Sequence, residues 1–499
     1  MLGNPDPKTL TGAREEKALP PVLFPGIDST ERRRLAELKA DGRIRSVGPR
    51  LYVSVPESQT ATTLRQTWST IVARLFPDAL ITHRTALEFR PSPAGEIFIN
   101  ASSHREVKYP GLVLKFIRGP GPLRDDPQFL TIRSSSLPRA FLENLSRGRA
   151  SRSRVLPIEE IEASLEKILH VGGEVELNRL RDRAREIADE LGWKAEIKRL
   201  DGVIGTLLGT RKGKVSSSIA QARAAGEPFD ASCLERMQLL FADLRIALPR
   251  TLDSFTAEDH FKNKAFFESY FSNYIEGTTF EVSEAEEIIF DKKIPASRPK
   301  DAHDVAGTFE IVSDQGEMRR TPNDFDELIQ LLRARHERML AQRPEVAPGR
   351  FKTEPNRAGE TRFVHPDYVR GTLRKGWELY RGLEPGLPRA IFIAFLVSDV
   401  HPFVDGNGRT SRIMMNAELV SAGQPTIIIP TVFRDDYLQA LRALSRRNRP
   451  APLVQSLIRA QKLSHLEFSP YPSILKELTR RNWFREPDEA RLVEGPLSG

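Results

Sequence analysis

The chain has 499 residues, of which 39% are hydrophobic and 28% are charged, and its formal net charge is +8. This length and composition predict a globular protein with two or three domains. Its single cysteine, Cys233, excludes an intrachain disulfide and a cysteine-based metal cluster. The sequence has neither a signal peptide pattern nor an apolar run of membrane-spanning length, so we expect a cytoplasmic protein without a membrane partner.

The positive charge is concentrated in the N-terminal third. Residues 1–160 hold 25 lysines and arginines against 17 acidic residues, which accounts for the whole excess. Such an asymmetry indicates contact with nucleic acid. The polar, proline-bearing residues 1–27 are predicted to form a mobile tail ahead of this basic region.

A helix followed by a basic hairpin is predicted next. The pattern of residues 31–40 is helical, Gly42 ends it, and residues 43–55 are typical of two short strands joined by a Gly-Pro turn. This order resembles the end of a winged helix-turn-helix. Its basic side chains are candidates for DNA phosphate contacts: Arg32, Arg33, Arg34, Lys39, Arg43, Arg45 and Arg50. A solvated basic face is the alternative interpretation.

The same region resembles the antitoxin regulators of the type IV (AbiEi-like) toxin–antitoxin family. The resemblance covers residues 28–210 and is carried by LKADGRIRSVGPRLYV at 38–53 and ITHRTALE at 81–88. It implies a winged helix followed by a mixed α/β domain. Alternating segments predict three strands of that domain, at 96–100, 112–117 and 129–132.

Helical patterns dominate the rest of the chain. Residues 158–168 and 176–191 are predicted to be two helices. Residues 211–230 are predicted to be a linker, and residues 231–465 a mainly helical domain. Residues 466–499 are less regular, and we expect them to form a C-terminal extension.

The most informative stretch is HPFVDGNGRTSR, which runs from His401 to Arg412. An apolar helical run at 390–397 leads into it, and a helical pattern resumes after Gly408. The glycine-rich turn is therefore predicted to lie at a helix N-terminus, where unpaired backbone N–H groups and the helix dipole favour an anion.

The side chains of this stretch suit a polyphosphate nucleotide. Arg409 and Arg412 lie three residues apart, on one face of the first helical turn, and both can reach phosphate oxygens. Asp405 can hold a hard cation such as Mg²⁺. His401 titrates near neutrality and can take a proton from an attacking hydroxyl.

HPFVDGNGRTSR is similar to the Fic signature HxFx(D/E)GNGRxxR at every specified position. Fic proteins mostly transfer AMP from ATP to a Ser, Thr or Tyr hydroxyl of a target protein. The resemblance implies that His401 is the general base and that Asp405 is the Mg²⁺ ligand. It also implies a nucleotide site, with an anion hole, phosphate ligands and packing residues, made of Phe403, Gly406, Asn407, Gly408, Arg409, Arg412 and Asn416.

A second motif lies upstream, where SNYIEG at 272–277 ends an amphipathic helical pattern. Alone, it favours an ordinary helix with a solvated glutamate. Beside a Fic signature it resembles the family's inhibitory pattern (S/T)xxxE(G/N), with Ser272, Glu276 and Gly277 at the specified positions. The resemblance implies that Glu276 pairs with Arg412 in the place of the γ-phosphate and inhibits the enzyme.

Glycine-punctuated segments between 349 and 366 are typical of a short hairpin. Fic domains place a flap here, whose edge pairs with the backbone of the target protein. The resemblance thus makes Thr361, Arg362 and Phe363 candidates for target docking. A plain surface hairpin is the alternative interpretation.

The combined prediction is a multidomain protein. An α+β region containing a winged helix-turn-helix precedes a mainly α Fic domain with a small β-hairpin flap. The expected function is a protein adenylyltransferase that uses ATP and Mg²⁺, is inhibited by Glu276, and carries a DNA-binding regulatory module. The alternatives are an antitoxin-like transcriptional regulator that uses its Fic domain as a nucleotide sensor, and an enzyme that removes AMP. A phosphotransferase of the Doc type is disfavoured because the GNGR run and the second arginine are intact.

Overall fold

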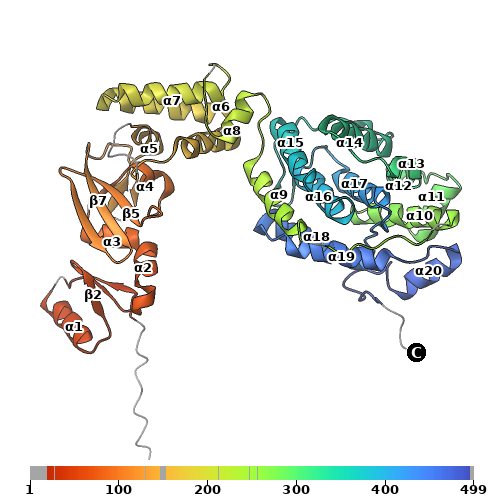
Figure 1. Cartoon of the computed structure of the whole chain (residues 1–499), viewed down its shortest axis with the longest axis horizontal. Helices are drawn as coiled ribbons and strands as arrows, with labels where there is room; N and C mark the ends of the chain where they lie inside the picture. The colour runs from red at the N-terminus through yellow and green to blue at the C-terminus, as the bar shows by residue number, and fades with distance from the viewer. Residues whose placement is uncertain are drawn as a thin grey trace, which may run out of the picture. The chain divides into compact units, whose positions relative to one another are not determined.

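The chain forms two compact units, Met1–Gln221 and Ala222–Gly499, in a computed structural model (Figure 1). The structure describes residues 19–494, except 27, 130, 147–152, 212, 247 and 256. Most of the predicted tail lies outside these residues. At its end, however, Val22 and Leu23 form strand β1 and pair with β3, so the prediction of a tail is wrong there. None of the described helices is long and apolar enough to cross a membrane.

The first unit begins with a small antiparallel sheet in the order β1-β3-β2 and one helix. These elements are β1 (Val22–Leu23), α1 (Ser29–Ala40), β2 (Arg45–Gly48) and β3 (Leu51–Val53). The predicted helix and hairpin are confirmed. A helix-turn-helix needs two helices, and the described residues ahead of the hairpin contain only α1. The winged helix therefore stays a prediction.

A six-stranded mixed sheet in the order β6-β7-β5-β4-β9-β8 forms the middle of the first unit. Its strands are β4 (Leu80–Ile81), β5 (Glu96–Ala101), β6 (Arg105–Tyr109), β7 (Leu112–Arg118), β8 (Gln128–Phe129) and β9 (Ile132–Ser134). The helices around it are α2 (Glu57–Gln66), α3 (Trp68–Leu75), α4 (His83–Glu88) and α5 (Leu137–Asn144). The segment predicted as one strand at 129–132 belongs to two antiparallel strands, because Phe129 pairs with Ile132 instead of preceding it in the same strand.

Three helices follow: α6 (Ile158–Leu191), α7 (Lys194–Leu207) and α8 (Ser218–Ala224). The two helices predicted at 158–168 and 176–191 are the two halves of α6. Gly173, at φ +69°, interrupts the helical backbone between them. Helix α8 falls inside the predicted linker, so that segment contains regular structure.

The second unit is mainly helical, and Figure 1 shows α16 and α17 in its middle. Its helices are α9 (Ala231–Leu244), α10 (Glu258–Ile275), α11 (Val282–Phe290), α12 (Pro299–Val312), α13 (Gln315–Met318), α14 (Phe325–Met339), α15 (Val369–Tyr380), α16 (Leu387–Val400), α17 (Asn407–Ser421), α18 (Arg434–Arg447), α19 (Ala451–Ser464) and α20 (Tyr471–Arg480). Short 3₁₀ turns occur at Pro344–Val346, Pro366–Tyr368 and Thr431–Phe433. The apolar run at 390–397 is buried, as expected for a central helix.

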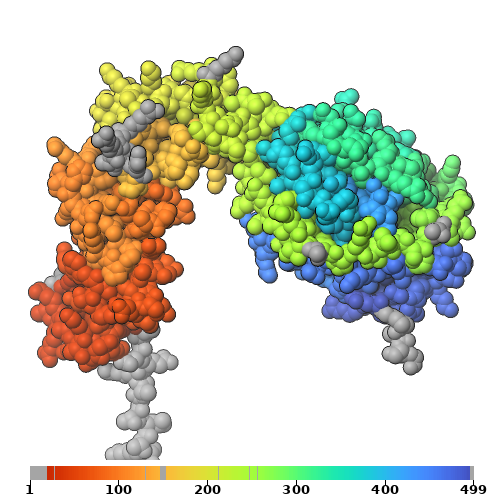
Figure 2. Space-filling view, viewed as in Figure 1, coloured from red at the N-terminus to blue at the C-terminus, as the bar shows by residue number. Residues whose placement is uncertain are grey.

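The C-terminal segment packs against α10. Trp483 is fully buried, and its ring centroid lies 5.6 Å from that of Phe271 on α10. Phe484 stacks on the same Phe271 ring at 5.2 Å. Residues 466–494, predicted as an irregular extension, therefore contain α20 and complete the core behind α10. Figure 2 shows the last helices in blue along the lower edge of the second unit.

We expect Trp483→Ala to lower the free energy of unfolding of the second unit by about 3–5 kcal/mol, because it leaves a large cavity in a closed core. Urea unfolding, with hydrogen exchange of α10 as the local measure, tests this. Ile294→Ala is the control, since Ile294 is 38% exposed and its truncation costs about 1 kcal/mol at most. Equal unfolding midpoints for the two variants would contradict the packing argument.

Candidate functional site

The turn between α16 and α17 has two residues with positive φ. His401, at φ 53°, ends α16, and Gly406, at φ 74°, directly precedes α17. A Cβ atom on Gly406 would lie 2.7 Å from a methyl carbon of Leu340, so glycine is needed there for conformation and for space. The prediction that the glycine turn lies at a helix N-terminus is confirmed.

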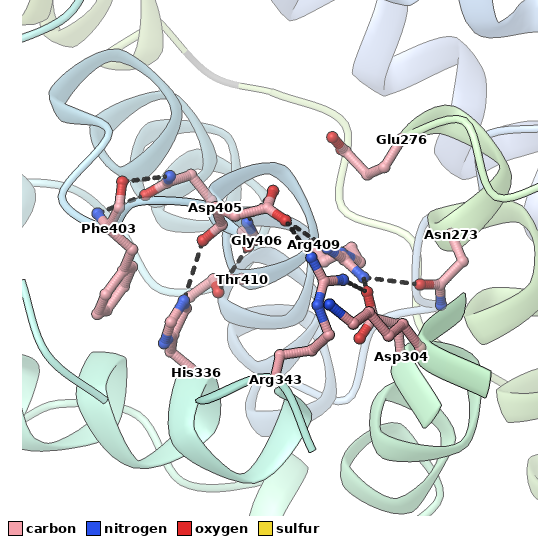
Figure 3. Close-up of polar contacts among 12 residues, drawn as sticks. Asn273, Glu276, Asp304, His336, Arg343, Phe403, Asp405, Gly406, Arg409 and Thr410 are labelled. Carbon is pink, nitrogen blue, oxygen red and sulfur yellow. Dashed lines mark hydrogen bonds and ion pairs between the residues drawn. The ribbon is translucent and has the colours of Figure 1, made fainter. Parts of the chain in front are cut away.

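The loop inside this turn is fixed by side-chain contacts to its backbone. The Asn407 amide accepts from the Phe403 N–H at 2.8 Å and donates to the Phe403 carbonyl at 2.9 Å. The Phe403 ring is fully buried and stacks on His336, with 3.8 Å between centroids. Because His336 Nδ1 accepts from the Gly349 N–H, its Nε2 carries the proton and donates to the Asp405 carbonyl at 3.0 Å (Figure 3). Burial lowers the pKa of His336 to about 4, so the ring is neutral.

His401 is held by two contacts. Its ring lies flat on Phe363, with 3.6 Å between centroids and 4° between planes. Its Nδ1 lies 3.3 Å from the Ser398 carbonyl, which fits an Nδ1–H donor and leaves the Nε2 lone pair free to accept a proton. Burial lowers the pKa of His401 to about 4, so the imidazole is neutral near pH 7. The candidate base is therefore oriented and in the form that can accept a proton.

Arg412 is bound by the end of α10. Its Nε donates to the Ser272 hydroxyl at 2.9 Å, and its Nη2 donates to the Ser272 carbonyl at 2.8 Å and to Glu276 Oε1 at 2.7 Å. A Cβ atom on Gly408 would lie 2.1 Å from the same Glu276 oxygen, so this carboxylate rests directly on the first turn of α17. The structure thus brings together Ser272, Glu276 and Arg412.

Arg409 is bound by partners that we did not predict. Its Nη1 donates to Asp304 on α12 at 2.5 Å and to the side-chain oxygen of Asn273 at 3.2 Å. Arg343 donates to the same Asp304 oxygen at 2.9 Å, so two guanidinium groups share one buried carboxylate (Figure 3). Desolvation is the largest influence on Asp304 and raises its pKa, while Arg409 opposes this.

Asp405 is the half-exposed carboxylate of the site. Its Oδ1 accepts from the Gly406 N–H at 2.7 Å, and its Oδ2 lies 3.5 Å from Arg343 and 3.8 Å from Arg409. Across the described part of the chain, no group of three or more His, Cys, Asp or Glu side chains could hold a metal ion. Mg²⁺ commonly takes one or two protein carboxylates and completes its shell with phosphates and water. Asp405 fits that pattern as a single protein ligand.

A cavity of about 380 Å³ lies beside His401, Gly408 and Arg412. Residues lining it include Glu276, Thr361, Phe363, His401, Gly408, Arg412, Tyr437, Arg442 and Arg446. The predicted hairpin forms one side as β10 (Arg357–Ala358) and β11 (Thr361–Arg362), paired antiparallel. Arg446 Nε donates to the Thr361 hydroxyl at 2.8 Å and ties the hairpin to α18.

Among the predicted residues that do not line the cavity, two have structural contacts of their own. Asn416 is fully buried and exchanges two hydrogen bonds with the backbone of Ile427, at 2.8 and 2.9 Å. Asn416 therefore holds the segment after α17 in place, and its role in the nucleotide pocket stays a prediction. Gly277, at φ 94°, allows the chain to leave α10 in a left-handed conformation.

The predicted DNA-contacting residues lie in the first unit. Arg32, Arg33, Arg34 and Lys39 are exposed on α1, and Arg43 and Arg50 are exposed beside the hairpin. Arg45 differs, because it is half-buried and donates to the Thr60 hydroxyl. Its guanidinium therefore has a structural partner.

Comparison with known proteins gives matches to part of the chain. Residues 325–419 match the Fic/DOC family model. The chain is 33% identical over 111 residues to protein adenylyltransferase fic-1 of Caenorhabditis elegans, which covers 21% of this chain and 22% of that protein. It is 27% identical over 242 residues to protein adenylyltransferase Fic of Drosophila persimilis, which covers 46% and 45%. The chain thus spans less than half the length of these relatives.

Among solved structures, a segment of Fic-1 from C. elegans is similar, with 18% identity, a TM-score of 0.35, and coverage of 64% of this chain and 98% of that one. A Fic-domain signalling protein from Bacteroides thetaiotaomicron has 21% identity, the same TM-score, and coverage of 47% and 95%. The family match contains the whole HPFVDGNGRTSR stretch, so the loop described above lies within the matched region. The second unit of this chain contains a Fic domain with homology to the protein adenylyltransferases.

Proposed function

We propose that the second unit transfers AMP from ATP to a Ser, Thr or Tyr hydroxyl of a target protein. One observation carries this proposal: a neutral, oriented histidine lies in the same cavity as a helix N-terminus flanked by two buried arginines. A neutral imidazole can accept a hydroxyl proton, and the helix N-terminus with its arginines can hold a polyphosphate. These are the two requirements of nucleotidyl transfer.

In the proposed reaction, His401 Nε2 takes the proton of the target hydroxyl while the hydroxyl oxygen attacks the α-phosphorus of ATP. The bond to the bridging oxygen breaks, and pyrophosphate leaves on the opposite side. The backbone N–H groups of 406–408 and the guanidinium groups of Arg409 and Arg412 hold the phosphates. Asp405 would hold Mg²⁺, which neutralises phosphate charge when it is bound.

We also propose that Glu276 inhibits this reaction. Its carboxylate rests on Gly408 and engages Arg412, so a γ-phosphate that uses the same guanidinium has to displace it. The Arg412 side chain is only 7% exposed, so solvent screening of the ion pair is weak. A carboxylate and a phosphate compete for the same planar fork of donors, which makes Glu276 an effective substitute for a phosphate.

The first test is Glu276→Gly with α-labelled ATP. One charged hydrogen bond contributes roughly 1.5–3 kcal/mol, so we expect self-labelling to rise by about tenfold to a hundredfold. Glu467→Gly is the matched control, because Glu467 is an exposed glutamate in the same unit, and we expect it to label as the parent does. Equal incorporation by the parent and Glu276→Gly proteins would refute the inhibition.

The second test places His401→Ala in the Glu276→Gly protein. Loss of the general base should reduce label transfer by about a hundredfold or more, with ATP binding retained. Label from α-labelled but not γ-labelled ATP identifies AMP transfer, whereas label from γ alone identifies phosphorylation. Release of AMP from a labelled protein, without net transfer, would favour AMP removal as the activity.

A second candidate function, DNA binding, concerns the first unit. The observation that favours it is the row of exposed arginines on α1, within a region that carries the whole charge excess of the chain. Exposed guanidinium groups on one short helix can contact successive phosphates of a duplex. We therefore propose a regulatory role for the first unit through DNA.

Arg33→Glu combined with Arg34→Glu should weaken binding of the full chain to its own promoter DNA. We expect the slope of log affinity against log salt to fall by about two, one for each lost phosphate contact. Arg90→Glu is the control, because Arg90 is an arginine of the same unit with a 71% exposed side chain. An unchanged slope in the double variant would remove α1 from the interface.

A further inference from the structure

A basic groove lies on the second unit between α18 and α19. Its volume is about 650 Å³, and its polar lining includes Gln439, Arg442, Arg446, Arg447, Gln455 and Arg459. Asp436 is the one acidic residue among the described residues that line it. The lining carries four guanidinium groups and one carboxylate, and even with Arg459 paired to Glu494 the groove favours an anionic occupant.

One of the groove arginines already pairs with a carboxylate. The Arg459 guanidinium lies 5.1 Å from the centre of the buried Phe433 ring, and its Nε donates to Glu494 at 2.6 Å. Glu494 belongs to the C-terminal segment of the chain, so a carboxylate on a peptide can reach the groove arginines. In the wall, the Ser456 hydroxyl is buried and makes no hydrogen bond to any described residue. An occupant would therefore meet the charge of the groove arginines, while the Ser456 hydroxyl is buried beneath the surface.

The groove and the cavity of the candidate base share two lining residues. Arg442 and Arg446 line both spaces, and Arg446 also donates to Thr361 of the hairpin. A peptide that runs along the hairpin and places a hydroxyl near His401 would therefore continue into the groove. Its neighbouring residues, and not the modified one, would meet the arginines.

We propose that this groove, which we call the α18–α19 groove, binds an acidic segment of the target protein next to the modified hydroxyl. The inference rests on the proposed AMP transfer and adds the substrate class. Clustered arginines recognise carboxylates through paired N–H donors. Single-stranded nucleic acid is disfavoured because its grooves offer exposed aromatic rings for stacking, whereas Phe433, the one aromatic residue lining the groove among those described, is 2% exposed and covered by Arg459.

The test measures binding without ATP, so it is independent of catalysis. The probe is a fluorescent peptide with one serine flanked by Asp and Glu residues, and binding to the full chain is followed by anisotropy. Arg447→Glu combined with Arg459→Glu should weaken binding by about tenfold, because charge reversal at two positions replaces attraction with repulsion. Arg449→Glu is the matched control, since Arg449 is an exposed arginine just beyond α18 that does not line the groove, and we expect less than about a twofold effect.

Equal binding of the acidic peptide by the parent and double-variant proteins would overturn the proposal. So would loss of binding of a short single-stranded RNA in the double variant while acidic peptide binding persists. In the Glu276→Gly background, the double variant should label itself as before but lose transfer to the acidic peptide. If Glu276→Gly transfers no AMP at all while the peptide still binds through Arg447 and Arg459, the proposed function fails and the groove stands as an acidic-peptide site.

Discussion

The ion pair between Arg412 and Glu276 links the two motifs of the candidate site, and the proposed regulation depends on it. It joins the first turn of α17 to the end of α10, and it places a carboxylate on Gly408. The Arg412 guanidinium is also oriented by two hydrogen bonds to Ser272, one to the hydroxyl and one to the carbonyl. Under the proposed function, a nucleotide would meet an arginine that is already oriented by its neighbours, and it would replace only the charged oxygen of Glu276.

The packing of α10 explains how Glu276, at the end of this helix, is kept beside Arg412. Trp483 and Phe484 pack on Phe271 from the side of the C-terminal segment, so the helix cannot shift without opening that core. Within the segment 272–277, the Glu276 side chain is 33% exposed, whereas Ser272 is 5% exposed. The inhibition that we propose would therefore be released most easily by rotation of the Glu276 side chain alone, with α10 and the Ser272 contacts left in place.

The sequence predicted this site where its residues are adjacent in the chain. His401, Asp405, Arg409 and Arg412 share one turn and one helix, so spacing alone was sufficient to group them. Asp304 was not predicted, because its contact with Arg409 spans 105 residues and nothing local marks an ordinary helical aspartate. Asn416 was predicted because it follows Arg412 by one helical turn, whereas its bonds to the Ile427 backbone could not be predicted from local spacing. The packing of residues 466–494 was missed since aromatic spacing there follows no single period.

The contacts that hold His401 are independent of Glu276. Phe363 and Ser398 hold the imidazole, and neither contact involves α10. Its pKa of about 4 arises mainly from burial, and the charge of Glu276 only raises it, so removing that carboxylate leaves the base neutral. The base is therefore in the same form whether or not Glu276 is in place. The inhibition that we propose therefore acts on how the phosphates are held, and for this reason we expect loss of a single carboxylate to activate transfer.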